Sequence, residues 1–171
     1  MRISRTTTHR FFTDVLPLLL WMAFIFPVWN RALGSSSIYT AFASVFHWAL
    51  PHASRHALDV CYIIFRKTLH VIEYGLLAFL FYRAFRAGHE PFWSKRVGLE
   101  AAAAAVAYGL LDEYLQSFAP NRFGSPIDWV IDTVGIVAVI ALIAHAGRRR
   151  SSGQLGPGPG FERQPRDASR P

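Results

Sequence analysis

The sequence predicts an all-α membrane protein, a four-transmembrane-helix bundle with a short interfacial helix between spans one and two. Long apolar runs are the first reason: 52% of the 171 residues are hydrophobic. The second is their distribution, since very polar ends hold the mean hydropathy at only +0.23. Four of the runs contain about the twenty residues that a helix needs to cross the hydrocarbon of a bilayer. A chain of this length has room for one domain.

The predicted spans cover residues 12–29, 68–86, 97–118 and 126–146. The first contains Pro17 and Pro27, which spans tolerate when neighbouring helices satisfy the freed backbone groups. A charged segment precedes this run, so a cleaved signal peptide is the alternative, but no clean A-x-A site follows and we favour an uncleaved span. The run 38–50 is too short to cross a bilayer, so we expect an interfacial or re-entrant helix there.

The distribution of Lys and Arg predicts the orientation. Most of the 18 basic residues lie in the N-terminal tail, in the loop after the second span and in the C-terminal tail. The positive-inside rule therefore places both termini in the cytoplasm of a multi-pass protein. We expect a cytoplasmic tail over 1–11, a membrane domain over 12–146 and a disordered basic tail over 147–171, which is too rich in Gly, Pro, Ser and Arg to bury a core.

Charge and cysteine content exclude several classes of protein. The net charge of +7 would suggest nucleic acid in a soluble protein, but no basic stripe with interleaved aromatic residues occurs, so no nucleic-acid partner is expected. The single cysteine, Cys61, excludes an internal disulfide and any multi-cysteine metal site.

Polar residues gather at the outward ends of spans two, three and four. They recur at helical spacings of three and four, so each set shares one helix face, and facing lipid would strand their charges. We therefore expect an outward-facing polar pocket whose ligand-binding residues are Lys67, His70, Glu73, Asp112, Glu113, Gln116, Arg122, Asp128 and Asp132. Gly75, Gly109 and Gly135 are small residues that let helices approach closely.

Two motifs in this region resemble the VanZ-like family. The first is K-x-x-H-x-x-E-Y, from Lys67 to Tyr74, and the second is D-E-x-x-Q-x-F-x-P-x-R-x-x-S-x-x-D-x-x-x-D-x-x-G, from Asp112 to Gly135. The resemblance implies a small four-span protein of the bacterial inner membrane, related to a protein associated with low-level resistance to the glycopeptide teicoplanin. Two departures are Asp132, where the family more often has Asn, and Val139, which replaces a second family glycine and suggests looser packing.

Three interpretations of the pocket remain open. The first, which we favour, is non-enzymatic binding of a membrane lipid, a lipid-linked envelope precursor or an amphiphilic antibiotic, linked to envelope homeostasis or glycopeptide tolerance. The second is an intramembrane acid/base or metal-assisted enzyme acting on an envelope lipid, with His70, Glu73, Asp112 and Glu113 as catalytic candidates. No H-E-x-x-H or G-x-S-x-G motif supports it, and we assign no metal ligand and no cofactor. The third is a polar cluster that only fixes helix packing.

Overall fold

The computed structural model describes residues 7–25, 35–86, 92–118 and 126–153, and every regular element in these ranges is helical, which confirms the all-α prediction. The side chains of Gln116 and Pro126 and of residues 35–37 and 151–153 lie outside the described part. The helices are α1 (Thr7–Arg10), the π-helix η1 (Phe11–Val15), α2 (Leu16–Ala23), α4 (Ser35–Ala49), α5 (Arg55–Arg86), α6 (Lys95–Gln116) and α7 (Pro126–Gly153).

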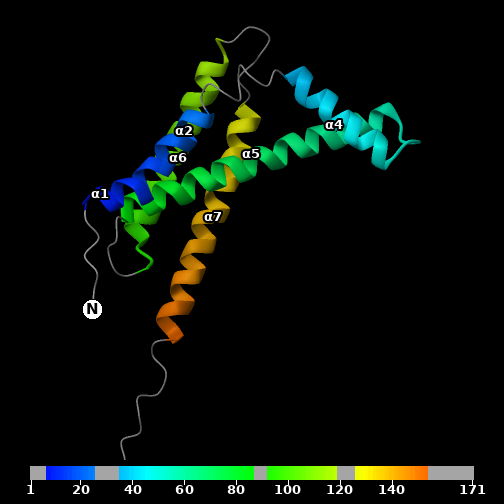
Figure 1. Ribbon diagram of the computed structural model, residues 1–171. Helices are drawn as coiled ribbons and strands as arrows, with labels where there is room; N and C mark the ends of the chain where they lie inside the picture. The colour runs from blue at the N-terminus through cyan, green and yellow to red at the C-terminus, as the bar shows by residue number, and fades with distance from the viewer. Residues whose placement is uncertain (1–6, 26–34, 87–91, 119–125, 154–171) are drawn as a thin grey trace, which may run out of the picture.

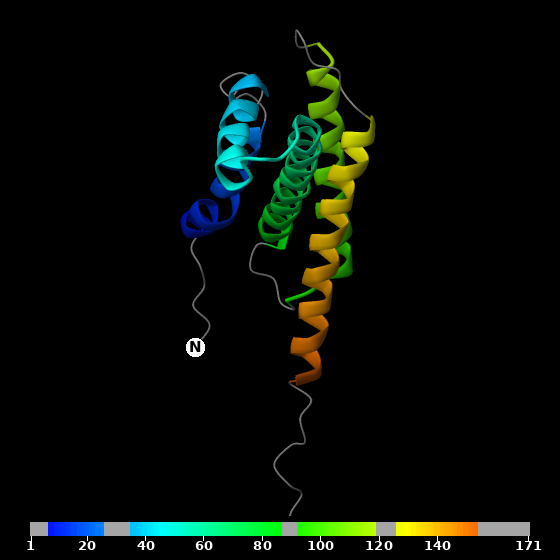
Figure 2. The same ribbon diagram turned by 90° about the vertical axis from the view of Figure 1, so that its right-hand side faces the viewer.

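Helix α5 is the central element (Figure 1). It crosses the antiparallel pair α6 and α7, and the turned view shows it between this pair and the N-terminal helices (Figure 2). Leu77 and Ala78 of α5, Ala101 and Ala105 of α6 and Ile136 of α7 are fully buried in the shared core. Alanines spaced four apart leave a flat helix face, which allows α6 to lie close to its neighbours.

Gly75 and Gly135 allow α5 and α7 to approach closely, as expected of small residues. A Cβ at Gly135 would collide with the backbone of Val71, and a Cβ at Gly75 would lie 3.3 Å from the carbonyl oxygen of Gly135. A methyl group of Val139 lies against Gly75, 2.9 Å from the same Cβ position. The looser packing expected at Val139 is therefore not found, because its side chain fills the space over a glycine.

The second predicted span, 68–86, is only the C-terminal part of α5. This helix has 32 residues and begins at Arg55, where Ser54 Oγ accepts a hydrogen bond from the amide of Ala57. Its length of about 48 Å exceeds the roughly 30 Å of the hydrocarbon core. The added segment is stabilised by α4, which packs Tyr39 on Tyr62 with ring centroids 4.9 Å apart and Phe42 on Phe65 at 5.0 Å.

Together, α4 and residues 55–65 form an arm that extends from the bundle (Figure 1). Helix α4 confirms a short helix between the first two predicted spans, and its interfacial position remains a prediction. Its outer side is apolar, since Val45 is 66% and Trp48 is 86% exposed.

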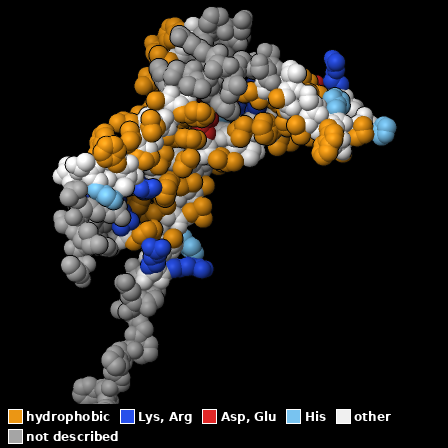
Figure 3. Space-filling model, in the orientation of Figure 1, with side chains coloured by type: hydrophobic (Ala, Val, Ile, Leu, Met, Phe, Trp, Pro, Cys, Tyr) orange, Lys and Arg blue, Asp and Glu red, His pale blue; other side chains and the backbone are white. Residues whose placement is uncertain are grey.

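Among the described helices, one segment, Ile127–Arg150 of α7, is long and apolar enough to cross a membrane, with a hydropathy of 2.2. Charged residues interrupt the apolar runs of α5 and α6, where Glu73, Arg83, Asp112 and Glu113 lie. Four spans therefore remain a prediction. Hydrophobic side chains nevertheless cover much of the face in Figure 3. Large apolar side chains are exposed on α7 as well, such as Leu142 at 66%.

The end of the bundle at the C-terminal ends of α5 and α7 is basic. Basic side chains gather around the lower end of α7 (Figure 3). The guanidinium carbons of Arg86 and Arg150 lie 5.0 and 4.4 Å from the ring centroid of Phe92. The next residue, Trp93, stacks on Tyr82 and fills the space over Gly98 and Gly147, so this end is held together by aromatic packing.

Candidate functional site

Three polar pairs link one face of α5 to its neighbours. Lys67 forms an ion pair with Asp128 of α7. His70 Nδ1 lies 3.2 Å from Asp132 Oδ1, also on α7. Tyr74 donates a hydrogen bond of 2.9 Å to Asp112 Oδ2 on α6. We call these six residues the polar cluster. Lys67, His70 and Tyr74 share a face because they are spaced by three and four, and the same spacing aligns Asp128 with Asp132.

The polar cluster becomes more buried from Lys67 toward Tyr74, in the direction of the C-terminal end of α5. The side chains of Lys67 and Asp128 are 36% and 19% exposed, and those of His70 and Asp132 are 12% and 1% exposed. A buried carboxylate is costly unless it is paired or hydrogen-bonded. The donors on α5 therefore stabilise acids that α6 and α7 place in the core.

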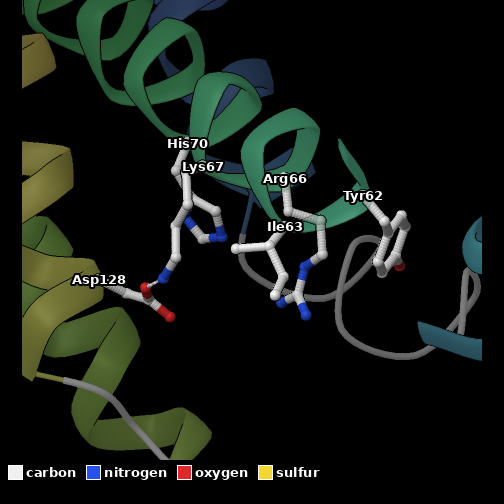
Figure 4. A pocket seen from close by; sticks show the side chains of 6 residues that line it. All are labelled: Tyr62, Ile63, Arg66, Lys67, His70 and Asp128. Carbon is white, nitrogen blue, oxygen red and sulfur yellow. Dashed lines mark ion pairs between the residues drawn. The ribbon is translucent and has the colours of Figure 1, made fainter. Parts of the chain in front are cut away.

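A cavity of about 350 Å³ lies at the more exposed end of the polar cluster, beside Lys67 and Asp128. It is lined by Tyr62, Ile63, Arg66, Lys67, His70 and Asp128. In the close view, Lys67 and His70 leave the same part of α5 side by side, and the Lys67 ammonium points to Asp128 (Figure 4). Arg66 extends into the same space from the neighbouring position (Figure 4). Three nitrogen-bearing side chains thus surround a space of ligand size.

Arg66 lies before the second predicted span, and its place in the cavity was not predicted. Its guanidinium forms no hydrogen bond or ion pair with the described residues, whereas the charge of Lys67 is matched by Asp128. A signal was available, because Arg66 precedes His70 by one helical turn and shares its face. It was overlooked because the helix was expected to begin after Arg66.

Tyr74 was also missed as a functional residue, although it is part of the first motif. It is 1% exposed, and its ring is nearly parallel to that of His70, with centroids 6.5 Å apart. Its hydroxyl connects Asp112 to the rest of the polar cluster. The spacing of four from His70 was the signal in the sequence.

The structure brings together five of the nine predicted ligand-binding residues, namely Lys67, His70, Asp112, Asp128 and Asp132. Glu73 and Glu113 are buried, with 8% and 7% exposure, and neither lines the cavity. Arg122 and the side chain of Gln116 lie outside the described residues. Whether any of these residues binds a ligand remains a prediction.

The N-terminal helices hold α5 in place from the other side. Trp21 Nε1 donates a hydrogen bond of 3.1 Å to the carbonyl oxygen of Glu73, and Tyr108 donates one of 2.7 Å to that of Met22. Asp14 pairs with Arg83 at 3.0 Å. The contacts of Glu73 and Arg83 join α5 to the N-terminal helices, whereas the contact of Tyr108 joins α6 to α2.

The chemistry of the site follows from its charges. Arginine and lysine side chains around one cavity are suited to a phosphate or carboxylate group. Within the described ranges, no group of three or more His, Cys, Asp or Glu side chains converges in a way that suits a metal ion. The residues that are described therefore favour an anionic ligand.

The comparison with protein families agrees with the motifs. The VanZ/LLP1 family pattern matches residues 12–147, which include every described element from α2 to the polar part of α7. No curated protein and no solved structure matches the chain. Because the match spans most of the sequence, the chain belongs to the VanZ/LLP1 family.

Proposed function

We propose that this protein is a multi-pass protein of the bacterial cytoplasmic membrane that binds the anionic headgroup of an envelope lipid or lipid-linked precursor. In this proposal the cavity faces outward, both termini are cytoplasmic, and the physiological role is envelope homeostasis or glycopeptide tolerance. Family membership is consistent with such a role.

The observation that carries the proposal is the position of Arg66. It lies partly buried in the wall of a cavity and has no anionic partner among the described residues, while Asp128 neutralises Lys67 beside it. A partly buried guanidinium without a counter-ion is unfavourable, and a phosphate can accept two parallel hydrogen bonds from it. A phosphate-bearing headgroup supplies that missing anion.

The volume of the cavity favours a headgroup over a whole antibiotic. About 350 Å³ is at the lower end of the usual range for small-molecule pockets. A glycopeptide antibiotic is far larger than this space. An effect on glycopeptide tolerance would therefore act through a lipid that the cell envelope uses.

The distance between the cavity and the basic end supports the orientation. Asp128 and Arg150 are both on α7, and the rise of a helix between them is about 33 Å. That is close to the thickness of the hydrocarbon core. With Arg148, Arg149 and Arg150 at the inner surface, as the positive-inside rule requires, the cavity lies at the outer headgroup level.

Lipid retention in nanodiscs tests the binding. The full chain is reconstituted in phosphatidylcholine with a small fraction of phosphatidic acid, a lipid that presents a phosphate monoester, and native mass spectrometry measures the lipid that stays bound. Arg66→Gln is expected to weaken retention of phosphatidic acid about tenfold, because a hydrogen bond to a charged group contributes about 1.5–3 kcal/mol.

Arg96→Gln is the matched control, since Arg96 is exposed on α6 and bound to Glu100. It should leave retention unchanged. Equal retention of phosphatidic acid and phosphatidylcholine by the unmodified protein, or equal loss in both variants, would refute the proposal.

A further inference from the structure

His70 is held by its neighbour in a way that leaves one ring nitrogen for the cavity. Nδ1 faces Asp132 Oδ1 at 3.2 Å, and Asp132 is 1% exposed. With Asp132 ionised and the imidazole neutral, the ring proton lies on Nδ1 and the lone pair on Nε2. His70 lines the cavity, and Nε2 makes no hydrogen bond within the described part of the chain. This is the arrangement of an oriented general base.

The cations of the cavity come from the same part of α5 as His70. Arg66 and Lys67 line the same space, and both leave α5 within one turn of His70 (Figure 4). Phosphoryl transfer depends mainly on positioning and on stabilisation of charge at the phosphate oxygens. Among the described residues that line the cavity there is no serine, threonine or cysteine, and we take water as the nucleophile.

We propose that the protein hydrolyses a lipid phosphomonoester in this cavity, with His70 as the general base. This inference rests on the proposed headgroup binding and adds a reaction to it. The oxygen of water forms a bond to phosphorus, the bond from phosphorus to the ester oxygen breaks, and His70 Nε2 takes the proton of the water. The leaving alkoxide takes a proton from the Lys67 ammonium, which His70 then restores. The products are a lipid alcohol and inorganic phosphate, and water is the only co-reactant.

The surroundings of the cavity favour a lipid as the alcohol part. Ile63 lines the cavity and is 56% exposed. An exposed apolar side chain in the cavity wall suits an acyl chain beside a charged headgroup. A soluble phosphomonoester would gain nothing from this surface.

Release of inorganic phosphate tests the reaction. The full chain in phosphatidylcholine nanodiscs is given dioctanoyl phosphatidic acid in one arm and glycerol 3-phosphate in the other. We expect release from the lipid and at least about tenfold less from the soluble ester. His70→Gln should lower the rate about 100-fold or more, the usual contribution of a general base. His145→Gln, the same change at an exposed histidine of α7, should not alter it.

Asp132 acts through His70 as a positioning residue, and its variant separates catalysis from packing. Asp132→Asn keeps the shape but allows the amide to donate to Nδ1, which moves the imidazole proton to Nε2 and removes the base. The expected result is loss of phosphate release by about 100-fold or more with retention of phosphatidic acid changed less than twofold. A purely structural role would change both.

The two proposals fail separately. Retention of phosphatidic acid without phosphate release, or release that His70→Gln does not reduce, would overturn the hydrolysis and leave the binding in place. Loss of both retention and release in the unmodified protein would overturn both. Release from both esters at equal rates would overturn the assignment to lipid.

Discussion

Asp132 Oδ1 lies 3.2 Å from Nδ1 of His70, although the two residues are 62 positions apart in the sequence. The contact joins α5 to α7 close to the point where Gly135 meets Val71. The polar contact and the closest backbone approach are thus less than one helical turn apart on α7. The glycine lets the helices come close enough for the histidine and the carboxylate to meet.

Adding one methyl group at this crossing should destabilise the protein. In Gly135→Ala, the new Cβ would meet the carbonyl oxygen of Val71, which belongs to backbone and cannot move aside alone. Overpacking of this kind costs about 1–3 kcal/mol. The free energy of unfolding in detergent micelles is the measurement. Val137→Ile adds a methyl group at a position that is 57% exposed and should change it by less than about 0.5 kcal/mol. Equal effects of the two changes would contradict this account of the crossing.

Removing the hydroxyl of Tyr74 should cost stability through Asp112. Tyr74→Phe deletes the donor of the 2.9 Å hydrogen bond to a carboxylate that is 4% exposed. Buried groups that lose a partner cost about 1–3 kcal/mol in water-soluble proteins, and polar contacts in membranes average about 0.6 kcal/mol, so we expect about 1 kcal/mol. Thermal unfolding of the parent protein and of Tyr74→Phe measures this loss of stability. Tyr114→Phe, at a tyrosine that is 61% exposed, is the control. If both variants unfold like the parent, the Tyr74 hydroxyl does not stabilise the core.

Neutralising Asp128 should strengthen the binding of anions. Its carboxylate pairs with Lys67 in the wall of the cavity, so Asp128→Asn leaves the ammonium free for a ligand. A charge change at this distance in a partly exposed site is worth about 1 kcal/mol, or roughly fivefold in affinity. Retention of phosphatidic acid in nanodiscs should rise by that factor and fall again at high salt. Unchanged or weaker retention would mean that the cavity does not bind the headgroup through its cations.

Cys61 is a natural reporter of topology. It is the only cysteine of the sequence and is exposed on the arm, within two turns of the cavity. Because the proposed function places the cavity on the outer side, a maleimide that cannot cross membranes should label Cys61 in intact spheroplasts. In a second form, Cys61→Ser combined with His145→Cys, labelling should require permeabilisation, because position 145 lies near the basic end. The reverse pattern would place the cavity in the cytoplasm.

Much of the fold followed from local rules of sequence. Apolar runs and helical spacing predicted the helices that became α4, α6 and α7, and they indicated that Lys67, His70, Asp128 and Asp132 lie near one another. The pairs Lys67–Asp128 and His70–Asp132 were found only in the structure. The helix predictions succeeded because each depends on the geometry of a single helix.

The parts that sequence reasoning missed depend on contacts between distant segments. The start of α5 at Arg55 depends on aromatic packing against α4, which no local pattern in residues 55–67 reveals. The place of Arg66 in the cavity followed from that longer helix. The pairing of Asp14 with Arg83 joins the first helices to the end of α5, and a charge count by loops does not detect it.

The length of α5 has a mechanical consequence. One rigid helix of 32 residues carries the arm at its beginning and the donors of the polar cluster in its middle. The close contact with Gly135 of α7 lies near that middle. If the arm rests on the lipid surface, a change in bilayer thickness or lateral pressure would tilt the whole helix about this point. The same tilt would slide Lys67 and His70 past their acidic partners, so the state of the membrane would set the geometry of the cavity.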